Sequence, residues 1–260
     1  MATETASDWN TQKKRWTMLK ELHPASLDLR RISLLRDARL GDLGAEDQLT
    51  ALLPELGLNN EGLSEFPLAL LPHCGQGLRV WQYPIQFSPY LVQLSRLRIR
   101  SYLEIGIRHG GSFVTTAEYL ERFDPLEFAV GVDVIPCPSM SDYARLNPKA
   151  EFVCVNTLGP EFPKLLDRLG SIDLAFIDSH HEEKQCQREL GLLEEHVNMI
   201  AFHDISNVGC PGVRNVWSEL AARSDYECFE YTAQYPGLGP YMGIGLAVKK
   251  SRFVQEGQDQ

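Results

Sequence analysis

The chain has 260 residues, of which 43% are hydrophobic, and it carries a formal net charge of −10 at pH 7. This acidic balance disfavours a nucleic-acid partner, because nucleic-acid phosphates require a basic surface. No apolar run is long enough to cross a bilayer, and residues 1–10 lack the basic flank and apolar core of a secretory signal. The six cysteines contain no C-x-x-C pair, which favours reduced thiols. We therefore expect a cytoplasmic globular protein with no membrane partner.

The first hundred residues carry helical patterns. Leucine spacing and helix-capping residues predict helices over residues 16–22, 26–40, 45–56 and 88–97. The stretch 57–87 is rich in proline and glycine and predicts no regular element. We expect residues 1–97 to form a helical extension that could act as a lid, and residues 98–260 to form the main domain.

From residue 101 onward, apolar runs alternate with helical patterns. The apolar runs predict strands that are buried on both faces. They cover residues 101–105, 128–134, 151–155, 172–177 and 197–202. The helical patterns cover residues 112–122, 139–146, 161–169, 183–196 and 211–223. Two last strands are expected over 226–231 and 242–249, joined by a loop rich in glycine, proline and tyrosine. Such alternation predicts an α/β fold around a parallel sheet with right-handed crossovers.

A glycine-rich turn follows the first of these strands. The strand ends at Glu104 and Gly106, and Gly110, Gly111 and Ser112 then open a helix. Glycine lets the backbone approach a bulky ligand closely, and amides at a helix start can bind electronegative ligand atoms. The turn therefore predicts a cofactor site, although an ordinary strand-to-helix turn would look similar.

A second acidic residue helps to distinguish the cofactor classes. Asp133 ends the next strand, 27 residues after Gly106, a spacing that suits an acid binding a ribose diol. The glycines do not match the G-x-G-x-x-G spacing of a dinucleotide site. Glu104 disfavours a phosphate-rich cofactor and suits a cationic one, because like charges repel at short range. The pattern thus favours S-adenosylmethionine (SAM) over a nicotinamide dinucleotide.

Polar residues end each of the first five strands. In an open α/β sheet, ligands bind beyond the carboxyl ends of the strands. The residues at these ends are Glu104 to Gly106, Asp133, Asn156, Asp178, and His203 with Asp204. We expect them to converge on one site.

Residues 101–249 resemble the class I SAM-dependent methyltransferases, and in particular a branch that includes macrolide-sugar O-methyltransferases and cephalosporin-biosynthesis proteins. The segments that carry the resemblance are Glu104-Ile-Gly106-x-x-x-Gly110-Gly111-Ser112, Gly131-Val-Asp133, Phe176-Ile-Asp178-x-x-His181, Phe202-His203-Asp204-Ile205, and Cys210-Pro211-Gly212-Val213 followed by Trp217. The resemblance implies a Rossmann-like fold with a mostly parallel seven-stranded sheet and a C-terminal antiparallel strand. The N-terminal helical extension is expected from the leucine spacing, because no family motif matches the first hundred residues.

The resemblance also implies roles for individual residues in cofactor binding. Glu104 and the turn 106–112 would hold the methionine end of SAM, and Asp133 would bind its ribose. Asn156 and Thr157 would lie near the adenine.

A divalent metal and a general base complete the implied site. Asp178, His203 and Asp204 match the metal ligands of the family, and His181 matches its general base. His203 stands where relatives carry a carboxylate, and magnesium disfavours imidazole, so manganese or another borderline ion would suit the site better. The implied reaction is methylation of a hydroxyl on a small natural product or glycoside, with His181 and Asp178 as catalytic residues.

Some of these residues have structural alternatives. Asp178 could simply cap the following helix, and His203 could be a core histidine. Of the adjacent His180 and His181, we expect at most one to face the site. His109 could lie over the cofactor or on an exposed turn.

Other functions remain open at this point. The chain could be a metal-independent methyltransferase acting on nitrogen, carbon or a carboxylate, or a non-catalytic SAM-binding module. The chain could also form a homo-oligomer or be part of a multidomain biosynthetic enzyme, and the sequence does not decide between these possibilities. The acceptor would bind between the N-terminal helices and the loop 234–241, whose glycines and tyrosines suit a mobile, flat apolar wall or a structural hairpin connection.

Overall fold

The computed structural model describes residues 24–251, so the helix expected over 16–22 lies outside the described residues. A seven-stranded sheet with the order β3-β2-β1-β4-β5-β7-β6 forms its centre. The strands are β1 (Ser101–Ile105), β2 (Phe128–Asp133), β3 (Ala150–Cys154), β4 (Ile172–Ile177), β5 (Val197–His203), β6 (Tyr226–Tyr231) and β7 (Ile244–Lys249). Strands β1 to β5 pair in parallel, whereas β7 is antiparallel to both β5 and β6. The expected fold class is therefore confirmed.

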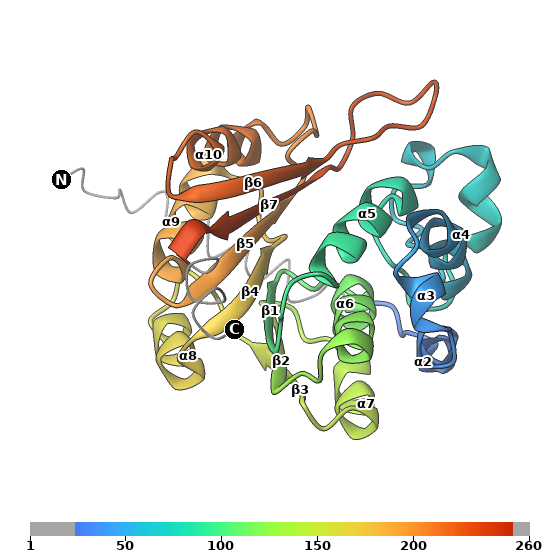
Figure 1. Ribbon diagram of the computed structural model, residues 1–260, viewed down its shortest axis with the longest axis horizontal. Helices are drawn as coiled ribbons and strands as arrows, with labels where there is room; N and C mark the ends of the chain where they lie inside the picture. Colours follow the sequence, from blue (N-terminus) through green and yellow to red (C-terminus); the bar gives the residue numbers. More distant parts are fainter. Residues whose placement is uncertain (1–23, 252–260) are drawn as a thin grey trace.

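Helices cover both faces of this sheet (Figure 1). One face carries α5 (Pro84–Leu94), α6 (Gly111–Phe123) and α7 (Ser139–Leu146). The other carries α8 (Glu161–Leu169), α9 (Glu183–Leu193) and α10 (Pro211–Ala221). From α6 onward, the helices begin and end close to the residues predicted from the sequence. Among residues 24–251, no helix combines the length and apolar character that a membrane span requires.

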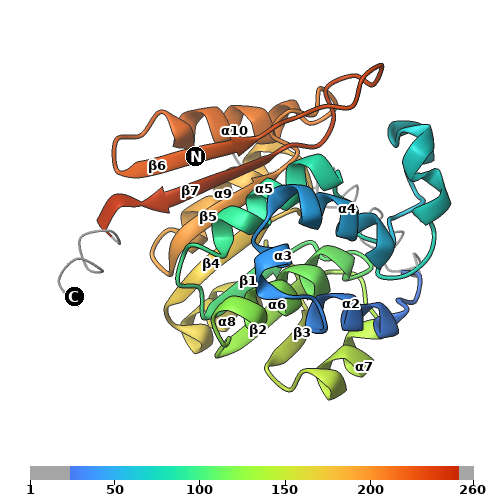
Figure 2. The same cartoon turned by 45° about the vertical axis from the view of Figure 1, so that its right-hand side comes forward.

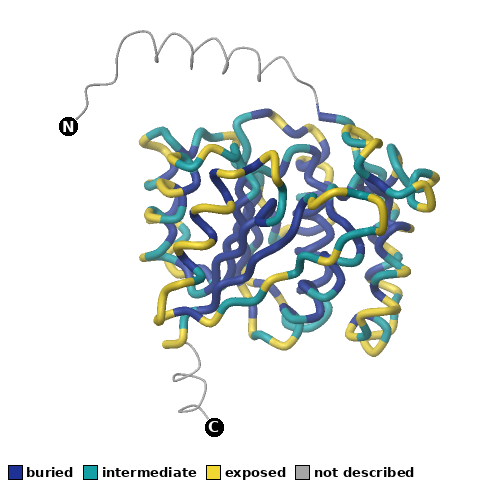
Figure 3. Tube along the Cα trace, turned by 90° about the horizontal axis from the view of Figure 1, so that it is seen from above, coloured by how far each residue is buried: buried dark blue, intermediate teal, exposed yellow. Residues whose placement is uncertain are grey.

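Two hydrophobic clusters, one on each face, hold the layers together. The first joins Phe113 of α6 and Leu246 of β7 to N-terminal residues such as Leu35 and Leu53. The second packs α8, α9 and α10 against the sheet, with Trp217 among its buried residues. The buried backbone lies mainly in the central strands (Figure 3), as expected for parallel strands covered on both faces.

The edge strand β3 departs from this pattern. We expected it to be buried on both faces, but four of its five residues are partly or fully exposed. The reason is its position, because β3 pairs only with β2 and its other edge has no neighbouring strand in the sheet. Cys154 at its end is therefore exposed, whereas Cys186 and Cys210 are buried in the second cluster.

Two N-terminal helix predictions also need correction. The single helix expected over 26–40 is divided into the short elements η1 (Leu29–Ile32), α2 (Ser33–Arg36) and α3 (Leu40–Leu43), while the helix over 45–56 is confirmed as α4 (Glu46–Leu56). Two 3-10 helices, η2 (Leu63–Glu65) and η3 (Leu68–His73), follow in the irregular stretch.

The second correction concerns the start of α5. The helix expected over 88–97 begins earlier, with Pro84 in its first turn, a position that suits proline. The Ser88 hydroxyl was expected to cap the helix, but it donates a hydrogen bond to the Glu46 carbonyl at 2.7 Å. Ser88 thus joins α5 to α4.

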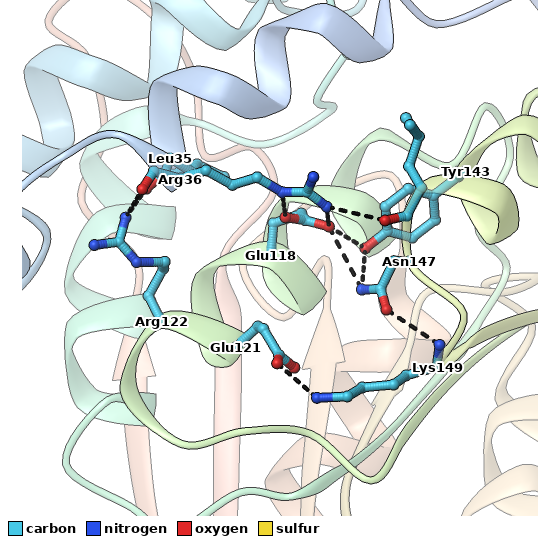
Figure 4. A network of polar contacts seen from close by, with 9 residues as sticks. Leu35, Arg36, Glu118, Glu121, Arg122, Tyr143, Asn147 and Lys149 are labelled. Atoms are coloured by element: carbon cyan, nitrogen blue, oxygen red, sulfur yellow. Dashed lines mark hydrogen bonds and ion pairs between the residues drawn. The ribbon is translucent and has the colours of Figure 1, made fainter.

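A polar network attaches the N-terminal segment to the sheet-covering helices (Figure 4). The Arg36 guanidinium donates two hydrogen bonds to the buried carboxylate of Glu118 in α6, at 2.7 and 2.9 Å. Tyr143 of α7 also donates to Glu118, at 3.0 Å. Arg122 of α6 donates to carbonyls at the end of α2, including that of Leu35, and satisfies groups that a helix end leaves unpaired.

The loop between β6 and β7 is attached to α5 by one buried glutamine. Figure 2 shows this loop extending beyond the ends of the strands. Gln86 of α5 donates to the carbonyls of Ala233 and Tyr241, at 2.7 and 3.2 Å, and accepts from the Gly243 amide at 2.9 Å. Both ends of the loop are thereby fixed against the helical segment.

Candidate functional site

Two adjoining hollows lie at the carboxyl ends of the strands. Hollow A has a volume of about 280 Å³ and is lined by residues that end or follow β1 to β4. Hollow B has a volume of about 720 Å³ and is lined by residues after β4 and β5, by part of the loop 234–241 and by N-terminal residues. Both hollows are bordered by Gly106, Arg108, Asp178 and Ser179. The predicted convergence of strand ends is therefore confirmed for β1, β2, β4 and β5.

Gly106 lies where the two hollows meet, and its position accepts only glycine. Its φ is +89°, and a Cβ on it would lie 2.1 Å from the Asp178 carbonyl oxygen. Such a φ strains any residue with a side chain, and such a contact cannot exist without a backbone shift. The end of β1 and the chain after β4 are thus in direct backbone contact.

The next glycines serve the protein's own packing. Gly111 would place a Cβ 2.0 Å from the Leu78 carbonyl oxygen, and Gly110 would place one 2.4 Å from the Met140 side chain. Neither glycine lines a hollow, and Ser112 does not either. The cofactor role of these residues stays a prediction, and in the structure the two glycines make room for neighbouring segments of the chain.

Glu104 is fully enclosed at the end of β1. Ser112 donates a hydrogen bond to its carboxylate at 2.5 Å, and the Tyr102 hydroxyl donates another. Burial raises the pKa of Glu104 to about 8, even though these two donors favour the ionised form. The carboxylate borders neither hollow, so it lies behind the site surface rather than on it.

Asp133, at the end of β2, lines hollow A as predicted. One carboxylate oxygen accepts the Arg108 amide at 2.8 Å, and the other accepts the Ile135 amide at 2.9 Å. Burial raises the pKa of Asp133, and these backbone donors oppose that shift. The Val134 amide is a further backbone donor, so three of the four lone-pair positions are used and one remains to accept a hydrogen bond from a diol.

A buried carboxylate that sequence analysis missed organises the opposite wall of hollow A. Glu189 of α9 accepts hydrogen bonds from Thr157 and Ser179, each at 2.5 Å, and from Gln185 at 3.0 Å. All three donors line the hollow. The available signal was helical spacing, because Glu189 lies three residues after the buried Cys186 and therefore on the inward face.

Asn156 follows β3, and its expected place near the adenine stays a prediction. Its side-chain oxygen accepts the Leu158 amide at 2.8 Å and stabilises the turn after β3. Thr157 and Leu158 line hollow A, but Asn156 does not.

Two carboxylates and two imidazoles meet at the edge of hollow B. His203 Nδ1 lies 3.0 Å from Asp178 Oδ1 and 3.5 Å from Asp204 Oδ2. His181 Nε2 lies 3.1 Å from Asp204 Oδ2 and 3.6 Å from Asp178 Oδ1. One ligand atom from each of the four residues lies within 4.8 Å of every other. Asp178, His203 and Asp204 were predicted as ligands, and the structure adds His181 to the same cluster.

The backbone and neighbouring side chains fix Asp204 in this cluster. Its φ is +63°, which is uncommon for a residue with a side chain and typical of constrained functional positions. Asn207 donates to Oδ1 at 3.0 Å, while the Cys210 thiol lies 3.6 Å from Oδ2. Burial alone would raise the pKa of Asp204, but His203 and His181 hold it well below its ordinary value.

The adjacent histidines after β4 both border the site, which corrects our expectation that only one would. His180 lines hollow A, and His181 lines hollow B. His109 fits neither alternative considered above, because it is buried and borders neither hollow. Its Nδ1 accepts the Ala25 amide at 2.9 Å, and its Nε2 lies 2.9 Å from Glu61.

Aromatic residues from two distant segments form a wall of hollow B. Trp81 and Tyr83 come from the segment before α5, and Tyr241 comes from the loop between β6 and β7. The Tyr83 ring centroid lies 5.7 Å from that of Tyr241 and 5.1 Å from that of Tyr235. The loop and the N-terminal segment therefore border the same hollow, as expected for an acceptor site.

The strand order defines the class of fold. The order β3-β2-β1-β4-β5 is that of Rossmann-like sheets, and the reversed β7 between β5 and β6 gives the class I methyltransferase arrangement expected from the sequence.

Comparisons with known proteins show similarity of fold. No protein-family model matches the chain, and no curated protein matches it. Among solved structures, the O-methyltransferase TomG from Streptomyces achromogenes, in complex with SAM, is 21% identical; the match covers 65% of this chain and 81% of that one, with a TM-score of 0.46. An O-methyltransferase from Bacillus cereus is 18% identical, with 82% and 92% covered and a TM-score of 0.46.

A third similar structure is that of the mycinamycin-pathway methyltransferase MycE in complex with Mg, S-adenosylhomocysteine and mycinamycin VI. It is 15% identical, the match covers 66% of this chain and 50% of that one, and the TM-score is 0.43. Such low identities do not extend the activities of these proteins to this chain.

Proposed function

We propose that this protein is a SAM-dependent methyltransferase that methylates a hydroxyl group of a small natural product or glycoside. The observation that carries the proposal is the junction of the two hollows at Gly106 and Asp178. A donor in hollow A and an acceptor in hollow B would meet at this junction, as a direct displacement requires.

Hollow A is lined by polar and apolar groups that would bind a nucleoside. Asp133 offers a carboxylate held in place by backbone amides to a ribose diol, while Ile135, Val155 and Leu158 offer apolar surface to an adenine ring. Thr157 is held by Glu189 on the same wall. Glu104 is enclosed at the end of β1 with a pKa of about 8, and we expect a cationic donor bound near Gly106 to favour its ionised form.

The cluster at hollow B fits a divalent cation. Asp178, His203 and Asp204 would hold it, with two oxygen donors and one nitrogen donor within 4.8 Å of one another. A bound cation would stabilise the alkoxide form of an acceptor hydroxyl. Because an imidazole is present, manganese suits these residues better than magnesium.

The side chains around hollow B would position the acceptor and control its proton. Trp81 and Tyr241 present flat amphipathic surface, which would orient the acceptor and displace water, and the fully buried Tyr83 packs against Tyr241. During transfer, the acceptor oxygen bonds to the methyl carbon, the carbon–sulfur bond breaks, and the hydroxyl proton must leave. The resemblance assigns this proton to His181.

We further propose a cytoplasmic enzyme whose partner is a small-molecule acceptor. The six cysteines support a reducing compartment, because all are free thiols in the structure.

Calorimetric titration with SAM and with NADH tests the cofactor assignment. We expect SAM to bind and NADH not to bind, and we expect Asp133→Asn to weaken SAM binding. The matched control is Asp142→Asn, since Asp142 is exposed and borders neither hollow. Binding of NADH alone, or equal SAM affinity in the two variants, would contradict the assignment.

Transfer assays with a panel of hydroxylated acceptors test the reaction. Chelation should abolish transfer, and added manganese should restore it. Full activity in chelator would favour a metal-independent methyltransferase, whereas SAM binding without turnover on any acceptor would favour a non-catalytic SAM-binding module.

A further inference from the structure

We infer that His181 is a fourth ligand of the cation, so that two imidazoles and two carboxylates form a site selective for a borderline metal such as Mn²⁺, Co²⁺ or Zn²⁺ over Mg²⁺. The inference rests on the proposed metal role of this cluster, and it replaces the general-base role that the resemblance assigns to His181.

The four distances between the imidazole nitrogens and the carboxylate oxygens are close to those expected around one ion. Ligand atoms about 2.1 Å from a metal lie about 3.0 Å apart in octahedral geometry and about 3.4 Å apart in tetrahedral geometry. The two contacts of His203 Nδ1 with the carboxylates measure 3.0 and 3.5 Å. Those of His181 Nε2 measure 3.1 and 3.6 Å. His181 therefore has the same relation to the carboxylates as His203, the predicted ligand.

The orientation of His181 also fits a ligand. Within residues 24–251, its Nε2 makes no hydrogen bond, although Asp204 Oδ2 lies 3.1 Å away. The nitrogen is close to both carboxylates without the alignment that a hydrogen bond needs. A nitrogen that donates its lone pair to a metal cannot also accept the acceptor's proton, so the two roles of His181 exclude each other.

A glycine contact holds the backbone of His181 in place. A Cβ on Gly212 of α10 would lie 2.8 Å from the His181 carbonyl oxygen and 2.4 Å from the Glu183 amide nitrogen. Only glycine lets the start of α10 approach the loop so closely. The Cys210-Pro211-Gly212 motif does not lie at the end of a strand, and the strand-end argument therefore gave it no role. Its glycine helps to position the inferred metal ligand His181.

The composition of the ligand set determines the metal. Magnesium prefers oxygen ligands and retains several waters, whereas two imidazoles suit manganese, cobalt, zinc or ferrous iron. With both His181 and His203 bound, half of the protein ligands are nitrogens. The site should therefore discriminate against Mg²⁺ more strongly than a site with one histidine.

Metal binding to the chelator-treated full chain tests the inference without any assay of activity. Titration calorimetry should show tight binding of Mn²⁺ and Zn²⁺ and much weaker binding of Mg²⁺. His181→Ala should weaken Mn²⁺ binding by more than about 100-fold, because even loss of a residue that only supports a ligand costs 10–100-fold. His180→Ala is the matched control, since His180 is adjacent and equally exposed but lines hollow A.

A spectroscopic measurement on the unmutated protein tests the number of histidine ligands even if the His181→Ala variant does not fold. Pulsed EPR of bound Mn²⁺ or Cu²⁺ should show coupling to two imidazole nitrogens, and the spectrum of His181→Ala should show one. A single nitrogen in the unmutated protein, unchanged Mn²⁺ affinity in His181→Ala, or equal affinity for Mg²⁺ and Mn²⁺ would overturn the inference.

Calorimetry with SAM separates this inference from the proposed function. Binding of SAM to a chain with a one-histidine metal site would overturn the inference alone. A two-histidine metal site in a chain that does not bind SAM would overturn the proposed function alone.

Discussion

The buried carboxylate of Glu104 should make the protein less stable as the pH rises from acidic to mildly basic values. Glu104 is enclosed at the end of β1, and burial raises its pKa from 4.5 to about 8. In the unfolded chain the carboxyl group is hydrated and loses its proton near the ordinary value. Replacement by glutamine removes the titration while preserving the size and hydrogen-bonding capacity of the side chain.

The sign and the size follow from linkage. Between the unfolded and folded pKa values, the folded state binds more protons, so the free energy of unfolding falls as the pH rises. The loss begins above the unfolded pKa and is complete above the folded pKa of about 8. At 1.36 kcal/mol for each pKa unit, this shift corresponds to about 5 kcal/mol over the whole window. Glu104→Gln should therefore gain stability relative to the unmutated protein as the pH rises.

Urea unfolding of both proteins between about pH 5 and about pH 9 measures this difference. Buried groups such as Asp133 and Glu189 also have raised pKa values, but they are present in both proteins and cancel in the difference. Tyr102→Phe provides a second test, because it removes a donor that lowers the pKa of Glu104 and should extend the window to higher pH. Parallel stability curves for Glu104→Gln and the unmutated protein would refute this reasoning.

Three further substitutions test contacts that position the site. Gly212→Ala should displace the loop after β4 and weaken binding of SAM and Mn²⁺ together, measured by calorimetry, whereas Gly191→Ala has no neighbour within 4 Å and should leave both unchanged. Arg36→Met should cost about 1–3 kcal/mol in urea unfolding, because it leaves the buried Glu118 carboxylate without its cation; no loss would show that the ion pair is dispensable. Gln86→Leu should speed hydrogen exchange in the loop between β6 and β7, and unchanged exchange would show that other contacts hold this loop.

The parts of the site that could be predicted from the sequence are those determined by strand ends. Parallel strands place their carboxyl ends at one edge, so Asp133, Asp178, His203 and Asp204 could be expected to converge from their positions alone. The orientation of Glu104 could not be predicted in this way. Its carboxylate turns inward because Ser112 and Tyr102 bind it there, and these contacts form only when α6 packs against β1.

The roles of the glycines also depend on tertiary contacts that could not be predicted from the sequence. A glycine in a turn is consistent with a ligand, a tight bend or another segment of the chain, and the sequence does not distinguish among them. Gly111 is required because Leu78, from a stretch with no predicted element, comes within 2.0 Å of where its Cβ would be. Gln86 could not be recognised either, because its partners lie about 150 residues later in the chain.

Residues 178–182 lie between the two hollows, because Asp178 and Ser179 line both and the next three residues line one or the other. His180 and Glu182 line hollow A, whereas His181 between them lines hollow B. Two glycines press on this segment, Gly106 against the Asp178 carbonyl and Gly212 against the His181 carbonyl. Because the backbone is held at both places, movement of the wall on the donor side would also move the metal ligands. In the proposed function, backbone contacts at two glycines would therefore keep a donor in hollow A close to an acceptor in hollow B, in addition to the side chains that would bind them.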